Sequence, residues 1–227
     1  MKILLTIFIL LTITLSYPGS SSGMYFNDGF TLFGKYITQK EGDKSSGIGL
    51  GFSYLSPQEA INSTDRPTLF QSGTFEINGL YTSVDNDGLD MQILSMGLGY
   101  YKNNIKIGFY YETLYDYSGE EVDQLNDWTN NTLDMSSNFQ MISIGSYKNV
   151  QIVNVDFVAF LNLMRTEGEV IMSYIFAGQE VNIENDGGAT LLQLGLGYKI
   201  DNLVIQPTVT INEDKEKRYS VNFLFNL

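Results

Sequence analysis

The sequence contains no histidine and no cysteine. Without histidine, the chain lacks the side chain that most often serves as a general base, a metal ligand or a pH switch. Without cysteine, it is neither a bacterial lipoprotein nor a secreted module held by disulfides. There is also no glycine-rich phosphate loop and no zinc-ligand spacing. These absences predict a protein without enzymatic activity, metal or other cofactor.

Positive charge is scarce as well. The chain has 13 Lys and Arg against 26 Asp and Glu, which gives a formal net charge of -13. A nucleic acid, or any other anionic partner held by simple electrostatics, is therefore not expected.

Only one long apolar run is present. It spans residues 3–15, is interrupted only by threonines, follows Lys2, and precedes the small residues and proline of segment 16–22. This order is typical of a secretory signal peptide, here residues 1–22, with cleavage after Ser16 or after Ser22. Residues 23–227 then form a single domain. Because no later run is long enough for a transmembrane helix, insertion into a membrane would have to use strands.

Instead of long apolar runs, the chain has alternation with a period of two. Ile48, Leu50, Phe52 and Tyr54 share one face of segment 47–54, with Gly and Ser on the other face. Such alternation predicts amphipathic strands of the length that crosses a bilayer. Ten strands are predicted, at about 29–39, 47–55, 69–83, 89–101, 105–117, 138–147, 150–164, 189–200, 203–212 and 218–227. Pro207 lies inside the ninth, where it removes a ladder hydrogen bond.

A weak repeat relates segments 97–105, 145–150 and 195–203: each has a strand glycine, a Tyr, a turn containing Asn, and an apolar residue. Because Asn tolerates positive φ, these predict tight hairpin turns on one rim, with their tyrosines in an interfacial girdle. The opposite rim is expected to carry long connections at 118–134 and 165–188. Residues 170–176 of the second are an alternative strand extension above a membrane.

The last strand is apolar on one face up to the final residue. That face carries Tyr219, Val221, Phe223, Phe225 and Leu227. The strand resembles the C-terminal sorting strand of bacterial outer-membrane β-barrels, and the resemblance implies recognition by the barrel assembly machinery.

Signal peptide, alternating strands, unequal rims and terminal strand together resemble a small outer-membrane β-barrel protein of a Gram-negative bacterium. The resemblance covers the whole mature chain. It implies an all-β, antiparallel, up-and-down transmembrane barrel of about ten strands, or alternatively eight, surrounded by outer-membrane lipid.

If the apolar faces meet lipid, the opposite faces fill the interior. The predicted interior network consists of Glu76, Lys106, Glu112, Asp156 and Lys199. Buried charges must be paired, so the lysines are expected to neutralise the carboxylates. The alternative is an acid/base pair of Glu112 and Asp156. Some barrel enzymes of this class use an Asp–His or Ser–His arrangement. Their catalytic residues have no counterpart in this chain, because it has no histidine.

Two polar loops remain to be interpreted. Segment 85–90 resembles the start of a calcium loop but lacks the later bidentate Glu, so a hairpin turn is favoured. Trp128, the only tryptophan, lies in the acidic segment 118–134 and would either anchor a binding surface or close that loop's own cluster.

The sequence thus predicts a non-enzymatic outer-membrane barrel with a structural, surface-interaction or narrow-transport role. Two alternatives stay open: a soluble secreted or periplasmic β-barrel binding an apolar ligand, and a His-free barrel hydrolase using carboxylates of the interior. For a barrel of eight to ten strands, a wide diffusion pore is not expected.

Overall fold

The computed structural model describes residues 29–39, 45–56, 74–86, 88–102, 104–152 and 155–227. The predicted signal peptide lies outside these residues. Within them, the chain forms ten strands and one short helix, α2 (Glu120–Trp128). The strands are β1 (Gly29–Gln39), β2 (Ser45–Leu55), β3 (Thr74–Asn86), β4 (Leu89–Lys102), β5 (Ile105–Gly119), β6 (Asp134–Ile152), β7 (Val155–Phe176), β8 (Gln179–Ile200), β9 (Leu203–Asn212) and β10 (Lys217–Asn226).

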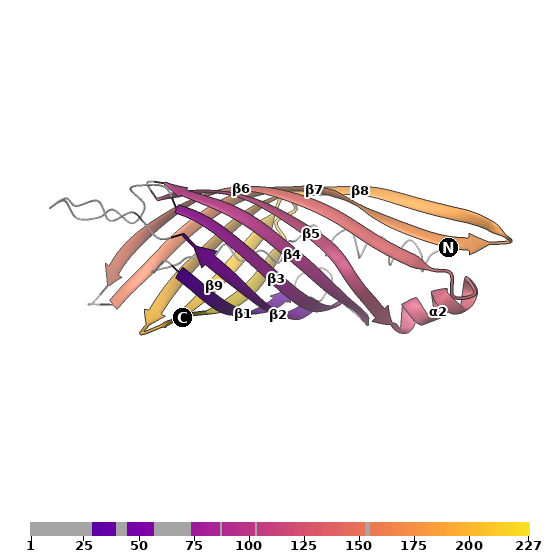
Figure 1. Cartoon of the computed structure of the whole chain (residues 1–227), viewed down its shortest axis with the longest axis horizontal. Helices are drawn as coiled ribbons and strands as arrows, with labels where there is room; N and C mark the ends of the chain where they lie inside the picture. Colours follow the sequence, from indigo (N-terminus) through magenta and orange to yellow (C-terminus); the bar gives the residue numbers. More distant parts are fainter. Residues whose placement is uncertain (1–28, 40–44, 57–73, 87, 103, 153–154) are drawn as a thin grey trace.

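The strands form one closed antiparallel barrel (Figure 1). Each strand pairs with its neighbour in the chain, and β1 pairs with β10 from Thr31–Asn226 to Gln39–Arg218, which closes the wall. The predicted fold of ten up-and-down strands is confirmed, and the alternative of eight strands is wrong. In the membrane-spanning part of the described strands, closure leaves no open strand edge, as a wall surrounded by lipid requires.

The apolar faces of the strands point outward. Ile48 and Leu50 are 65% and 71% exposed, whereas Gly47, Gly49 and Ser53 of the same strand are buried or half-buried. On β10 the outward positions are Tyr219, Val221, Phe223 and Phe225, and Leu224 is buried inside. A soluble barrel with its apolar faces inward is therefore the wrong interpretation. The predicted sorting face of β10 is part of the outward-facing apolar surface of the strands, which we call the apolar belt. Its role in assembly stays a prediction.

The two rims differ as expected for an outer-membrane barrel. At one rim the strands reverse tightly, with Lys102 paired to Ile105, Ile152 to Val155 and Ile200 to Leu203. Leu227 N–H donates to Phe30 O at this inner rim, 3.0 Å away, so β1 begins and β10 ends there. At the other, outer rim, β5 to β8 run on beyond the apolar belt (Figure 1). Short turns opposite long outer segments, around an apolar belt, place the barrel in the bacterial outer membrane.

Several local predictions were wrong. The predicted turn at Lys148 and Asn149 is instead strand, because β6 continues to Ile152 and β7 starts only at Val155. Segment 165–188 is not a loop: β7 and β8 continue through it to a turn at Ala177 and Gly178, both with positive φ. The alternative of a strand extension over residues 170–176 is confirmed.

The predicted tyrosine girdle is half wrong. Tyr101 and Tyr147 point into the barrel, are almost completely buried, and their rings lie 5.9 Å apart. Tyr198 lies outward, its ring 5.4 Å from that of Phe157 across β7 and β8. Alternation along a strand, rather than nearness to the turn, decides which tyrosine reaches the membrane interface.

Two other local predictions are confirmed. Pro207 interrupts the ladder between β8 and β9, which pairs Gly195 with Thr208 and next Tyr198 with Ile205. Segment 85–90 is a hairpin turn in which Gly88 N–H donates to Asp85 Oδ1 at 3.2 Å. Among the residues that the structure describes, no group of acidic side chains could hold a metal ion. In the same residues, no helix is long and apolar enough to span a membrane.

Candidate functional site: a filled interior and an outer extension

A buried carboxylate organises the interior of the membrane-spanning wall. Glu76 on β3 accepts hydrogen bonds from Ser53 Oγ on β2 (3.2 Å) and Asn78 Nδ2 (3.1 Å) at one oxygen. Its other oxygen accepts from Tyr101 OH on β4 and lies 2.5 Å from Lys106 Nζ on β5. Four consecutive strands therefore meet at one side chain.

Of the five residues of the predicted interior network, this arrangement brings together Glu76 and Lys106. A carboxylate has about four lone-pair sites, and the four partners of Glu76 occupy them. The Lys106 ammonium also lies 4.9 Å from the centroid of the Tyr101 ring. A carboxylate saturated in this way is held in place and has no free position for accepting a substrate's proton, so Glu76 is structural.

Glycines make room for this network. A Cβ at Gly99 would lie 2.9 Å from Lys106 Cε and 3.0 Å from Glu76 Oε2, and one at Gly97 would collide with the Tyr110 ring. Gly97 and Gly99 of this Gly-x-Gly pair therefore lie in the strand and relieve crowding inside the barrel. No helix follows them, so they are not nucleotide-binding glycines.

The predicted partners Glu112 and Asp156 do not meet. Glu112 pairs with Phe139 on β6, and Phe139 pairs with Gly168 on β7. Asp156 lies twelve positions along β7 from Gly168, on the order of 40 Å at the rise of an extended strand. An acid/base pair of Glu112 and Asp156 is therefore wrong.

Each of the remaining predicted interior residues has its own surroundings. The carboxylate of Glu112 is buried and accepts a hydrogen bond of 2.5 Å from Ser95 Oγ on β4. Lys199 on β8 is half-buried. The side chain of Asp156 lies outside the described residues. The sequence prediction missed Lys35, a buried lysine on β1, because it gave the bounds of the first strand without assigning residues to its two faces.

Large side chains fill the interior towards the inner rim. Tyr147 stacks on Phe160 with ring centroids 5.9 Å apart. One cluster of buried residues comprises Phe33, Leu55, Leu80, Tyr101, Tyr147, Val158, Phe160, Val204 and Leu224. The bulky side chains of Tyr101, Tyr110, Phe160 and Leu224 are all at most 4% exposed.

A second structural unit stands above the outer end of the belt, and we call it the outer extension: residues 114–134 and 166–190, with the facing ends of β3 and β4. β6, β7 and β8 contain 19, 22 and 22 residues. A transmembrane strand needs only about 9–11. The three strands therefore continue well into the surrounding water, and Figure 1 shows them running on beside α2.

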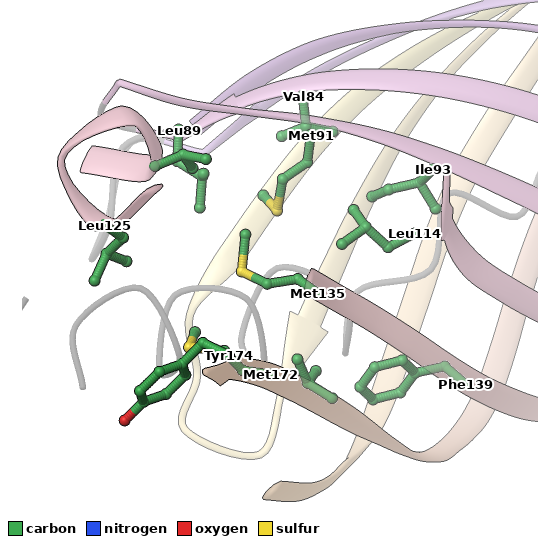
Figure 2. Packing of buried hydrophobic residues seen from close by; sticks show 12 residues of the cluster. Val84, Leu89, Met91, Ile93, Leu114, Leu125, Met135, Phe139, Met172 and Tyr174 are labelled. Atoms are coloured by element: carbon green, nitrogen blue, oxygen red, sulfur yellow. The ribbon is translucent and has the colours of Figure 1, made fainter. Parts of the chain in front are cut away.

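The extension has an apolar core of its own. Figure 2 shows Met91 from β4 and Met135 from β6 pointing toward each other, with Leu125 of α2 closing one side. The buried members are Val84, Leu89, Met91, Ile93, Leu114, Val122, Leu125, Met135, Phe139, Val170, Met172 and Tyr174. Burying a side chain of this size is worth about 1.5–3 kcal/mol, so the extension is an ordered unit with a hydrophobic core.

Side chains seal the wall where β5 leaves β6. The ladder between these strands ends at Glu112 and Phe139, and a bulge near Ile93 turns β5 aside. Above it, Thr113 Oγ1 donates to Ser137 O and Leu114 N–H donates to Ser137 Oγ, both at 2.8 Å. Tyr117 OH donates to Leu133 O at 3.3 Å and accepts from Met135 N–H at 3.1 Å. Burial raises the pKa of the Tyr117 phenol, which keeps this donor protonated.

Helix α2 was not predicted from the sequence, because segment 118–134 was interpreted as an acidic loop. A signal was present: Val122, Leu125 and Thr129 recur at spacings of three and four and are all buried on the core side. The helix ends as Thr129 Oγ1 donates to Leu125 O at 2.8 Å. With nine residues, α2 is held by its apolar contacts rather than by intrinsic helix propensity.

The far end of the extension exposes aromatic rings. Trp128 of α2 stacks on Phe176 of β7, with centroids 5.3 Å apart and planes at 26°, and it lies 5.7 Å from the Tyr174 ring. Trp128 and Phe176 nevertheless remain 49% and 51% exposed. Both functions predicted for Trp128 are thus geometrically possible: it closes a small cluster and presents an open ring face.

A polar hollow of about 580 Å³ lies on the outer face of β6 to β8, where the belt ends. It is lined by Asn138, Gln140, Arg165, Glu167, Gly168, Glu169, Asp186, Gly187 and Gly188. Arg165 Nε lies 3.1 Å from Glu167 Oε1, and Nη1 lies 3.8 Å from Glu213 Oε1. These pairs are exposed and contribute little to stability.

No family model and no curated protein matches the chain. Similar solved structures include Ail, the attachment invasion locus protein of Yersinia pestis (11% identity, 87% of this chain and 97% of that chain, TM-score 0.36). The translocator domain of autotransporter NalP from Neisseria meningitidis has 8% identity over 89% and 90% of the two chains, with a TM-score of 0.47. The N-terminal β-barrel domain of Pseudomonas aeruginosa OprF has 8% identity over 88% and 100%, with a TM-score of 0.33. At these values the role of the chain has to be inferred from its own residues. By its closed wall and its lipid-facing belt, it is a small bacterial outer-membrane β-barrel protein.

Proposed function

We propose that this protein is a non-enzymatic surface-interaction protein, in which the barrel anchors the outer extension and the extension binds a partner outside the cell. The observation that carries the proposal is the length of β6, β7 and β8, 19, 22 and 22 residues. About half of each strand is more than a membrane crossing requires. The additional length builds an ordered platform rather than a loop, because it has an apolar core.

The filled interior argues against a transport role. Tyr101, Tyr110 and Phe160 are buried inside the membrane-spanning wall, and the Glu76–Lys106 pair joins β3 to β5 across the inner face of β4. A barrel of this strand number is just wide enough to be filled by side chains.

The interior also offers no support for catalysis. Glu76 is saturated by its four partners, and Glu112 is hydrogen-bonded to Ser95. General acid/base work needs a carboxylate that a substrate can reach.

The test compares the native protein with a variant whose hairpin is shortened. Gly168 and Gly187 pair across β7 and β8, so replacing residues 169–186 by an Asn-Gly turn removes the projecting part and keeps the register. Cells displaying either form are applied to a panel of immobilised proteins and polysaccharides, and a gel shift on boiling confirms that both barrels are folded. We expect at least one ligand to retain only the cells with the native chain.

Equal retention of the two cell types by every ligand contradicts the proposal. Conductance of planar bilayers containing the purified protein tests the rival role. Defined single-channel steps from the native chain would favour narrow transport instead.

A further inference from the structure

We propose that the tip of the outer extension binds a cationic polypeptide segment, rich in lysine or arginine and carrying apolar side chains. The tip consists of the rings of Trp128, Tyr174 and Phe176 together with the acidic surface of α2 and the end of the β7–β8 hairpin. This proposal rests on the proposed surface-interaction function and names the chemistry of the partner.

The charge of the chain is concentrated in the extension. Segments 115–134 and 166–190 contain eleven of the 26 acidic residues and none of the 13 basic ones. The acidic residues are Asp116, Glu120, Glu121, Asp123, Asp127, Asp134, Glu167, Glu169, Glu180, Glu184 and Asp186. The rest of the chain has 15 acidic and 13 basic residues, so it is nearly balanced. A surface of one sign attracts ligands of the other sign over about a Debye length.

One carboxylate of helix α2, that of Asp127, lies at the end of the helix where negative charge is unfavourable. The carbonyl end of a helix is negative and is stabilised by nearby cations. Asp127 is exposed in the last turn of α2, which contains no basic residue, and Asp123 is exposed one turn earlier. A partner's ammonium or guanidinium groups at this end would supply the missing positive charge.

The aromatic rings add a second feature that suits the same partner. Trp128 and Phe176 present half-exposed rings in water, and Ile175, on the opposite face of β7, is 48% exposed. Ile175 pairs with Glu180 across the hairpin, so an apolar side chain and a carboxylate lie next to each other. Ring faces attract lysine and arginine within about 6 Å, and tryptophan is the most favourable ring.

Other occupants fit this surface less well. Phosphate groups of lipid headgroups or nucleic acids would be repelled by the acidic residues. A second copy of the chain would bring the same negative surface against itself. Among the described residues, no acidic group is arranged to hold a metal ion. A cationic polypeptide matches both the charge and the exposed rings.

Because Trp128 is the single tryptophan of the chain, its fluorescence reports on binding at the tip. The mature chain in lipid nanodiscs is titrated with a Trp-free peptide of about twelve alternating Lys and Leu residues, while Trp128 emission is recorded. Peptides with Glu or Gln in place of Lys serve as probes of charge. We expect a saturable change with the Lys peptide, at least about tenfold weaker binding of the Gln peptide, and weakening of the Lys peptide by added salt.

A matched pair of variants locates the binding. Asp123→Asn with Asp127→Asn should weaken the Lys peptide roughly five- to tenfold, since each exposed pair contributes a modest energy. Asp201→Asn with Asp214→Asn removes the same charge from exposed turns outside the tip and should leave binding unchanged. Trp128→Phe keeps an aromatic ring and, measured by calorimetry, should retain most of the affinity.

Equal effects of the two charge variants would overturn the proposal, as would equal binding of the Lys and Glu peptides. The absence of any response to the Lys peptide would overturn it as well. If the native cells are still retained on a ligand that the shortened variant does not bind, the surface-interaction function survives and only the cationic partner falls. If that difference is also missing, both proposals fail.

Discussion

The interior of the barrel has two parts, one within the membrane and one above it. Strand β4 lines both parts. In the membrane its inward residues are Ser95, Gly97 and Gly99, which face the hydrogen-bonded carboxylates Glu112 and Glu76. Above the membrane its inward residues are Leu89, Met91 and Ile93, which belong to an apolar core.

The outward face of the same strand changes in the opposite sense. Leu94, Met96 and Leu98 are exposed to lipid, whereas Asp90 and Gln92 face water. Along β4, the change from lipid to water on the outside is therefore matched by a change from small and polar to apolar residues inside. Where lipid covers the wall, an apolar side chain is no more stable inside the barrel than on the outside against lipid. Polar networks and glycines can therefore fill the interior there. Where water covers the wall, only an apolar interior stabilises it.

The largest expected effect comes from breaking the polar interior. Lys106→Met leaves the Glu76 carboxylate buried without its cation, and should cost about 3–5 kcal/mol of unfolding free energy. Urea unfolding of the folded barrel in detergent micelles measures it. Lys102→Met is the matched control, because Lys102 is exposed on the same hairpin and should change stability by less than about 0.5 kcal/mol. Similar costs for both variants would mean that the buried pair has no special role.

The apolar interior should fail locally instead. Met172→Ala removes a fully buried side chain from the core of the extension and should cost that unit about 2–5 kcal/mol, without unfolding the membrane wall. Protease cleavage within residues 118–134, at unchanged gel mobility of the barrel, measures the local opening. Ile175→Ala, on the exposed face of the same strand, is the control. Loss of the entire barrel with Met172→Ala would show that the two interiors are one cooperative unit.

An arginine placed on the outward face of β8 tests where the lipid-facing part of the strand ends and the water-facing part begins. Leu194→Arg, on the lipid-facing side of β8, should destabilise the barrel by about 2–4 kcal/mol if it lies near the bilayer midplane. Asn182→Arg lies on the same face of the same strand but in the extension, where it is exposed and should be almost neutral. Refolding titrations into phospholipid vesicles compare the two. An equally small cost at both positions would contradict the assignment of the belt.

The smallest effect tests the crowding of the polar interior. Gly97→Ala places a methyl group against the Tyr110 ring and Asn78 Oδ1 and should cost about 1–3 kcal/mol through overpacking. Gly197→Ala is the matched change, since the nearest atom to its Cβ, Val204 Cγ1, lies at an ordinary 3.5 Å. Denaturant midpoints in micelles should therefore fall for Gly97→Ala alone. If both variants fell equally, the loss would reflect strand glycines in general rather than the contact with Tyr110.

Much of the wall could be predicted from the sequence, because alternation with period two records which face meets lipid. The predicted strands 29–39 and 203–212 agree with β1 and β9 at both ends. Prediction failed where the pattern reverses. In β7 the outward residues change from Leu163 to Arg165 and Glu167, while Val170 and Met172 turn inward, so the search for one continuous apolar face ended the strand too early.

The candidate site could be predicted only in part. Glu76 and Lys106 belong to the inward faces of their own strands, which is a local property, and both are buried as expected. Their contact, and the absence of one between Glu112 and Asp156, depends on the register between strands that are far apart in the sequence.

The sequence by itself determined which side chains share one face of a strand, because alternation follows from the local pleat, and it predicted ten strands with eight as the alternative. Only the tertiary structure decided which charges pair inside the barrel, that the acidic loop is a helix packed on an apolar core, and that Trp128 lies against Phe176. These features depend on closure of the barrel, which brings residues of distant strands to the same level along the barrel axis. A local sequence pattern does not contain that level, because it is set by the register between strands.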